Sequence, residues 1–131
     1  MQRRLPASPA FGRNRTPILQ QLKHHVHDGA RVLEVASGPG EHVAYFADAL
    51  SPSVSWTPSE CDASLLPAIA ARASATAAQN VCSPLLLDAA GGWSHWSAAG
   101  VESGAYDAVL AVNLTHISPW ASTEGLLRGA S

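Results

Sequence analysis

The residues that first suggest chemistry lie in the segment RVLEVASGPGEHVAYF, residues 31–46. A short apolar run contains Glu34, and Gly38 and Gly40 follow it before a second apolar pattern begins. Glycines at such a junction let the backbone turn sharply and let a ligand approach it closely. An acid inside the turn would repel a pyrophosphate, so the segment favours a ligand with positive charge or with hydroxyl and amine donors.

Two more acids occur where the next two predicted strands end. Glu60, in WTPSECD, lies about 20 residues past Gly40, where nucleotide-binding α/β folds place a carboxylate on the ribose hydroxyls. Asp88, in PLLLDAA, follows the third strand, where a carboxylate can meet an adenine edge. A single acid at a strand end is usually a helix cap or a solvated loop residue. Three of them at consecutive strand ends, beside a glycine turn, predict a nucleoside site.

The spacing of the glycines argues against two other nucleotide sites. A dinucleotide-binding turn has the pattern G-x-G-x-x-G, but Val43 occupies the third glycine position. The lysine and the Ser or Thr of a phosphate-binding P-loop are missing as well. A nicotinamide-dependent oxidoreductase is therefore the weaker hypothesis, and a purely steric glycine turn is the structural alternative.

The elements that must position these residues alternate between helix and strand. We expect an extended N-terminal arm over residues 1–16, because prolines and a glycine interrupt any helix there, and one domain over residues 17–131. Hydrophobic periodicity and capping residues, with Thr16 as the first cap, predict the elements of this domain. The strands are expected at 31–35, 54–57, 84–87 and 106–112, the helices at 17–27, 41–50, 64–78 and 122–128, and a loop or short helix at 91–104. This order predicts an α/β sheet with right-handed crossovers.

VLEVASGPG resembles motif I of the class I S-adenosylmethionine-dependent methyltransferases. More narrowly, the segments RNRTPIL, VLEVASGPGEHVAYFA, WTPSECD, GGWSHW and NLTHISPWASTEGLLRGA are similar to the methyltransferase-like protein 26 family, from about Arg13 to the last residue. The resemblance implies a Rossmann-like doubly wound sheet of the class I methyltransferase type. It also implies S-adenosyl-L-methionine as the cofactor, with a methyl acceptor that the sequence does not name.

The family's cofactor roles carry over by position. Glu34, Ala36, Gly38 and Gly40 would hold the methionine part of the cofactor. The other implied cofactor contacts are Glu60 at the ribose, with Asp62 as its alternative, Asp88 and the adjoining Ala89 at the adenine, and Arg13 and Asn14 as a cover from the N-terminal arm. Two departures stand out: Ala36 replaces the first glycine of the general motif, and Glu60 stands where an aspartate is usual.

The acceptor side of the site depends on residues late in the chain. The resemblance places Asn113 near the sulfonium, and His116 in NLTHISPW is the candidate proton acceptor, since neutral imidazole accepts a proton near pH 7. A structural histidine and core packing of Trp120 are the alternatives for these side chains.

The sequence supplies only the first four strands of the class I sheet. The fourth strand would then have an open edge, which predicts marginal stability or self-association. The alternative function is therefore a truncated, non-catalytic form or interaction module that retains only part of the cofactor site.

Histidines and cysteines suggest no metal. His24, His25 and His27 form an HHVH cluster without a third ligand of suitable spacing, so we expect a solvated helix end. Cys61 and Cys82 do not form a CxxC pair, and we expect them to be small buried residues in a reduced compartment.

Composition bounds the function classes that remain. The 131 residues are 47% hydrophobic and 14% charged, with a formal net charge of -2, which suits one globular domain. No clear nucleic-acid or membrane signal is present. The start of the chain is Arg-rich and acid-free, as in transit peptides, but it lacks an amphipathic helix. We therefore expect an intracellular protein, cytoplasmic or nuclear rather than mitochondrial.

Overall fold

The computed structural model describes residues 9–102 and 104–112, with the backbone alone described at 9–14, 89 and 92–94. These residues form a four-stranded parallel sheet in the order β3-β2-β1-β4. Its strands are β1 (Arg31–Val35), β2 (Ser55–Glu60), β3 (Leu85–Leu86) and β4 (Ala108–Ala111). The helices are α1 (Pro9–His25), α2 (Glu41–Ala49), α3 (Leu66–Ser74) and α4 (Gly92–Ala98), with 3-10 turns η1 (Ala63–Leu65) and η2 (Ala89–Gly91). The predicted parallel α/β sheet is confirmed.

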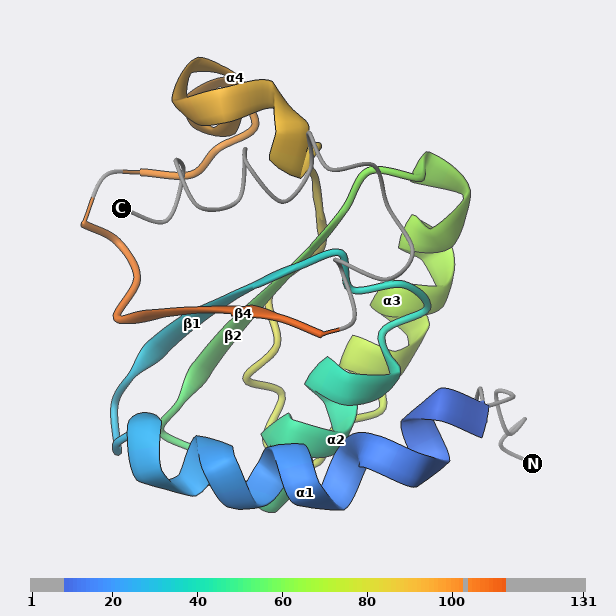
Figure 1. Cartoon of the computed structure of the whole chain (residues 1–131), viewed down its shortest axis with the longest axis vertical. Coiled ribbons are helices and arrows are strands. Elements are labelled where there is room, and N and C mark those ends of the chain that lie inside the picture. Colours follow the sequence, from blue (N-terminus) through green and yellow to red (C-terminus); the bar gives the residue numbers. More distant parts are fainter. Residues whose placement is uncertain (1–8, 103, 113–131) are drawn as a thin grey trace.

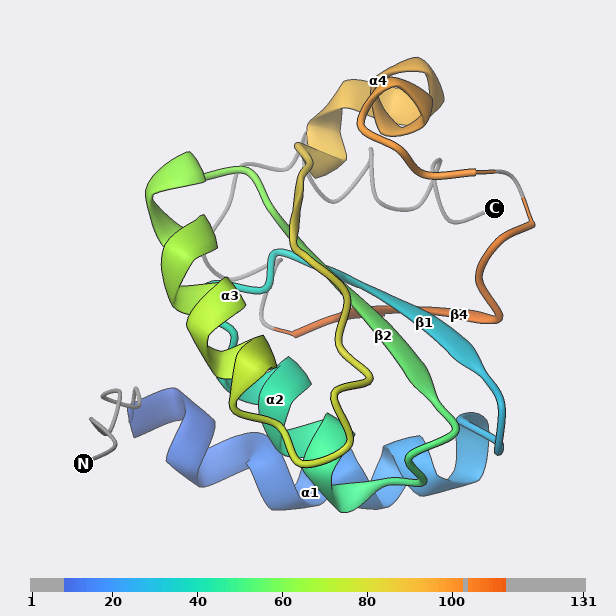
Figure 2. The ribbon, with the colours of Figure 1, turned by 180° about the vertical axis from the view of Figure 1, so that it is seen from behind.

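Helices cover both sides of the sheet. Figures 1 and 2 show α1 and α2 below the strands, α4 above them, and α3 beside α2. Two apolar clusters fill the spaces between these layers. The cluster on the α1 and α2 side includes Leu19, Val32, Phe46 and Trp56. The cluster on the α4 side consists of Leu33, Val35, Leu87, Trp96 and Val101.

The central strand β1 explains why Glu34 is buried. Its alternate residues face opposite sides of the sheet, so Val32 and Glu34 share the face toward α2. Both faces are covered, and all residues of β1 after Arg31 are buried. β1 pairs in parallel with β2 on one side and with β4 on the other, which places its carboxyl end in the middle of the sheet.

The first helix begins earlier than the sequence indicates. α1 starts at Pro9 and continues through Pro17, so the extended arm is wrong for residues 9–16 and Thr16 is not a helix cap. Proline in a helix interior costs about 3 kcal/mol, and packing can outweigh this cost. Here Leu19 packs into the core, and the Arg15 guanidinium lies 5.2 Å from the centre of the Tyr45 ring on α2. Residues 1–8 lie outside the described part of the chain.

The second strand extends beyond its predicted end. The strand predicted at 54–57 continues through Pro58, and β2 ends at Glu60. Ser59 supports the added residues: its N–H donates to Ser37 Oγ at 3.1 Å, and its Oγ donates to the Glu34 carbonyl at 2.6 Å. Glu60 is therefore the last residue of β2 rather than part of the loop after it.

The remaining predicted elements differ mainly in length. The strands predicted at 84–87 and 106–112 are shorter, and the helix predicted at 64–78 splits into η1 and α3 and ends at Ser74. A short helix, α4, lies within 91–104, while the helix predicted at 122–128 lies outside the described residues. Among the described helices, each is too short or too polar to span a bilayer.

Candidate functional site

The turn between β1 and α2 has a backbone conformation that few side chains tolerate. The φ angles of Ala36, Gly38 and Gly40 are 58°, 58° and 86°, in the left-handed region that favours glycine. Ala36 therefore holds a strained conformation at the position where the general motif has its first glycine. Such strain costs about 1–3 kcal/mol and is concentrated at functional sites.

The two glycines of the turn have different surroundings. A Cβ atom at Gly40 would lie 3.1 Å from Ile69 Cα, so this glycine allows the start of α2 to pack closely on α3. A Cβ atom at Gly38 would meet nothing within 4 Å. The backbone at Gly38 thus borders open space that a ligand can enter.

Glu34 is a buried carboxyl beneath this turn. Its side chain is 2% exposed, and Oε1 has no hydrogen-bond partner. Its pKa is raised from 4.5 to about 7: burial is the main cause, a hydrogen bond with Ser37 lowers the pKa, and the negative charge of Glu60 raises it. A buried polar oxygen without a partner is costly, so this atom is suited to accept a donor from a ligand.

Glu60 holds the turn from the neighbouring strand. Its Oε1 accepts the Gly38 N–H at 3.0 Å, and its Oε2 accepts the Asp62 N–H at 2.9 Å. Glu60 as a whole is only 7% exposed, and its charge acts on Glu34. The structure thus brings Glu34, Gly38 and Glu60 together, as the sequence predicts, and adds a direct bond between the last two.

Two serines that were not predicted from the sequence join the strand ends. The Ser37 N–H donates to the Ser59 carbonyl at 2.8 Å, and the Ser59 N–H donates back to Ser37 Oγ at 3.1 Å. Ser59 is completely buried. A polar residue within an otherwise buried strand was the available signal, because a buried hydroxyl requires a partner.

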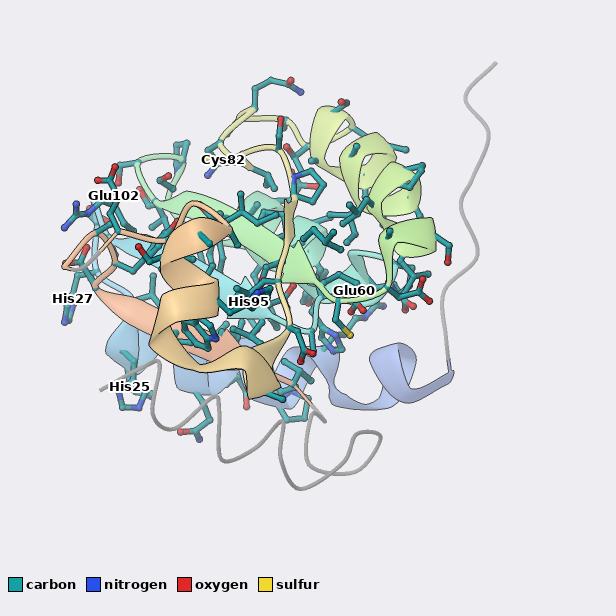
Figure 3. The ribbon with its side chains drawn as sticks, turned by 90° about the horizontal axis from the view of Figure 1, so that it is seen from above. His25, His27, Glu60, Cys82, His95 and Glu102 are labelled. Atoms are coloured by element: carbon teal, nitrogen blue, oxygen red, sulfur yellow. The ribbon has the colours of Figure 1, made fainter. Side chains whose placement is uncertain are left out.

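Asp88 lies at the end of β3 and organises the turn that follows. The Leu87 N–H donates to the Glu60 carbonyl at 3.0 Å, which keeps the ends of β2 and β3 together. Asp88 Oδ1 accepts the Ala90 N–H at 2.9 Å, so this exposed carboxylate also caps η2. The Asp88 N–H donates to Nε2 of His95, which projects from α4 toward this segment in Figure 3.

Two residues next to Glu60, Cys61 and Asp62, have different structural roles. Asp62 Oδ1 accepts the N–H and the hydroxyl of Ser64, which lowers the pKa of Asp62 and caps η1. Cys61 and Cys82 are both exposed, so the prediction that they are buried is wrong. Partial burial and the charges of Glu60 and Asp88 raise the pKa of the Cys61 thiol. Because the thiolate is the nucleophile, this environment does not activate Cys61.

The side chains of several predicted site residues lie outside the described part of the structure. Arg13 and Asn14 lie on α1, but the structure describes only their backbone. Asn113, His116 and Trp120 lie outside the described residues.

The histidine cluster lies away from the turn. His25 and His27 are on the opposite side of the molecule from Glu60 in the view of Figure 3. Among the described residues, no three His, Cys, Asp or Glu side chains are grouped so that they could hold a metal ion.

Solved structures share this fold at low sequence identity. YjhP from E. coli has a TM-score of 0.65 and 19% identity, with 99% of this chain and 48% of that chain covered. An S-adenosylmethionine-dependent methyltransferase from Geobacter sulfurreducens, solved with S-adenosyl-L-homocysteine, has a TM-score of 0.63 and 19% identity, with 100% and 47% covered. A methyltransferase from Aquifex aeolicus has a TM-score of 0.67 and 14% identity, with 95% and 63% covered.

These comparisons establish the fold as the α/β arrangement of the S-adenosylmethionine-dependent methyltransferases. The chain spans about half the length of the first structures that it matches. A family model also matches residues 5–131, nearly the whole chain, and it is described as a protein of unknown function. The chain therefore belongs to the DUF938 family.

Proposed function

We propose that this chain binds S-adenosylmethionine at the turn between β1 and α2, as a methyltransferase-like protein of the methyltransferase-like protein 26 family. The observation that carries the proposal is the buried Glu34 carboxyl, whose Oε1 has no partner and which lies beside a turn with open space at Gly38. The fold shared with methyltransferases, one of them solved with S-adenosyl-L-homocysteine, supports it.

The residues at the turn fit the amino-acid end of this cofactor. Its ammonium group carries positive charge and several N–H donors, which complement a carboxylate that lacks a partner. An approaching positive charge also favours the ionised form of Glu34, whose pKa of about 7 leaves it partly protonated near neutral pH. Ligand binding would then release a proton from Glu34.

The next two strand ends fit the nucleoside. A carboxylate has about four acceptor positions, and Glu60 uses acceptor capacity on the Gly38 and Asp62 N–H groups. The remaining acceptor positions of the Glu60 carboxylate would accept the two ribose hydroxyls, while its bond to the Gly38 N–H is kept. Asp88, anchored by the Ala90 N–H, would present its carboxylate to the amino group of adenine.

The protein's part in methyl transfer would be mainly positioning. When bound, the cofactor supplies an activated methyl group on a sulfonium, so proximity and orientation account for most of the catalysis. Glu34, Glu60 and Asp88 would fix the cofactor at three points along the strand ends. Asn113 and His116 are proposed for the acceptor side, with His116 as the base where the acceptor must lose a proton. The acceptor itself is unknown.

A second candidate is a non-catalytic module that binds the cofactor or a partner without methyl transfer. The observation that favours it is the edge of the sheet. Within the described residues, β4 pairs with β1 alone, so its other edge is available to a further strand. Self-association through this edge stays a prediction.

Calorimetric titration of S-adenosyl-L-homocysteine into the whole chain tests the proposal. Glu34→Gln keeps the size of the side chain but removes its charge, and we expect it to weaken binding by about 10- to 100-fold. The matched control is Glu102→Gln, an exposed acid between α4 and β4 that should leave the affinity unchanged. A folded wild-type chain that binds no S-adenosyl-L-homocysteine would refute the cofactor proposal, and equal binding by Glu34→Gln would refute the role of Glu34.

A further inference from the structure

We infer that His95 is the positioning residue for the adenine end of the proposed cofactor site, because its imidazole holds the Asp88 backbone at the end of β3. This inference rests on the proposed function. His95 is not among the cofactor contacts that the resemblance implies.

The contact itself defines what the imidazole does. The Asp88 N–H donates to His95 Nε2 at 2.9 Å. The accepting nitrogen therefore carries no proton, and the ring is held in the tautomer with its proton on Nδ1. His95 thus ties α4 to the residue that would contact adenine.

The surroundings of His95 leave it little freedom. A Cβ atom at Gly91 would lie 2.6 Å from both Cβ and Cγ of His95, so the imidazole occupies the space that a side chain at Gly91 would need. The next residue, Trp96, is 1% exposed and lies in the apolar cluster beneath α4, which fixes the rotation of the helix. Gly91 and Trp96 together direct His95 toward Asp88.

Two further bonds hold the Asp88 side chain and the Asp88 carbonyl. Asp88 Oδ1 accepts the Ala90 N–H, and the Asp88 carbonyl accepts the Gly91 N–H at 3.0 Å. With its own N–H held by His95, the backbone of Asp88 is fixed on both sides. Without His95, the Asp88 N–H would lose this acceptor, and Asp88 would be held only by its bonds to Ala90 and Gly91. The adenine contact would then be less well preorganised.

Three substitutions at His95 separate this role from simple packing. His95→Gln places a carbonyl oxygen near the position of Nε2 and should retain S-adenosyl-L-homocysteine affinity within about twofold. His95→Asn is polar but one methylene shorter, so it cannot reach the Asp88 N–H, and His95→Phe keeps the ring without an acceptor. Because one hydrogen bond contributes about 0.5–1.5 kcal/mol, we expect binding to be weaker by a factor of roughly 2 to 13 for both. His25→Phe, at the exposed end of α1, is the control for histidine loss.

The decisive measurement is a double-mutant cycle with Asp88→Ala, read out by calorimetric titration of S-adenosyl-L-homocysteine. Asp88→Ala should weaken binding by itself, and adding His95→Asn should then change the affinity by less than about twofold. Hydrogen exchange at the Asp88 amide, measured without ligand, should be faster in His95→Asn than in His95→Gln. The inference is overturned if all three His95 variants bind like the wild type, if Gln and Asn weaken binding equally, or if the losses are additive.

These outcomes are distinct from failure of the proposed function. If the wild-type chain binds but the His95 variants do not differ, only the inference fails. If the folded wild type does not bind, both the proposed function and the inference fail, even where the amide exchange confirms the contact between His95 and Asp88. Should His95→Phe not fold, the Asn and Gln pair still decides the question.

Discussion

Replacing Glu34 with glutamine should change how the stability of the protein depends on pH. Glu34 is 2% exposed, and its pKa is raised from 4.5 to about 7, chiefly by burial. Between these pH values the unfolded chain has released the proton that the native protein still holds. The unfolded state then binds fewer protons, so the free energy of unfolding falls as the pH rises.

The magnitude follows from this difference in pKa. Each pH unit within the interval lowers the free energy of unfolding by about 1.4 kcal/mol where the two states differ by a full proton. The difference is partial at both ends of the interval, so the expected loss between about pH 5 and pH 7 is about 2 kcal/mol. Since total stabilities are about 5–15 kcal/mol, a change of this size is measurable.

Urea unfolding followed by tryptophan fluorescence is a suitable assay, because Trp56 is fully buried in the core. The wild type, Glu34→Gln and the control Glu102→Gln are unfolded at several pH values. Other titratable groups, including His42, whose pKa burial lowers, are common to all three proteins. The difference between the wild type and Glu34→Gln therefore isolates Glu34.

We expect Glu34→Gln to gain about 2 kcal/mol relative to the wild type as the pH rises from about 5 to 7, and Glu102→Gln to gain nothing. The reasoning is refuted if the difference between the wild type and Glu34→Gln stays constant within about 0.5 kcal/mol over that range. A constant difference would mean that Glu34 ionises near its ordinary pKa, through hydration or a partner that the native structure acquires in solution.

The turn and the thiol beside it give three more predictions. Ala36→Gly should stabilise the chain by about 1 kcal/mol in urea unfolding, because it relieves a φ of 58°; a loss of stability would show that Ala36 is not strained. Gly40→Ala should destabilise the chain by about 1–3 kcal/mol more than Gly38→Ala, because only Gly40 faces a backbone atom at 3.1 Å; equal losses would contradict the packing argument. Cys61 should react with iodoacetamide more slowly than free cysteine at pH 8 and should react faster in Glu60→Gln, because the Glu60 charge helps to raise the pKa of the thiol; mass spectrometry of the labelled peptide measures both rates.

The sequence by itself determined the elements whose signals are local. The limits of β1 are those predicted, and α2 begins at the predicted residue. Both signals, a β-branched apolar run and a helical hydrophobic period, can be recognised within a few residues of sequence. The alternation of these elements was enough to predict the parallel sheet. Gly38 and Gly40 marked the turn, since left-handed φ angles restrict the choice of residue. Acids at three successive strand ends predicted a ligand site there, which stays a prediction.

Only the tertiary structure decided the features that depend on distant partners. The start of α1 at Pro9 overrides local helix breakers, and the core contacts of its later residues form only after α2 and the sheet pack together. The burial and raised pKa of Glu34 require both faces of β1 to be covered. The bond from Gly38 to Glu60 spans 22 residues, and the exposure of Cys61 and Cys82 depends on where the ends of β2 and β3 meet the surface. Residue type and spacing predict which groups can interact, whereas desolvation and long-range hydrogen bonds arise only when separate elements come into contact.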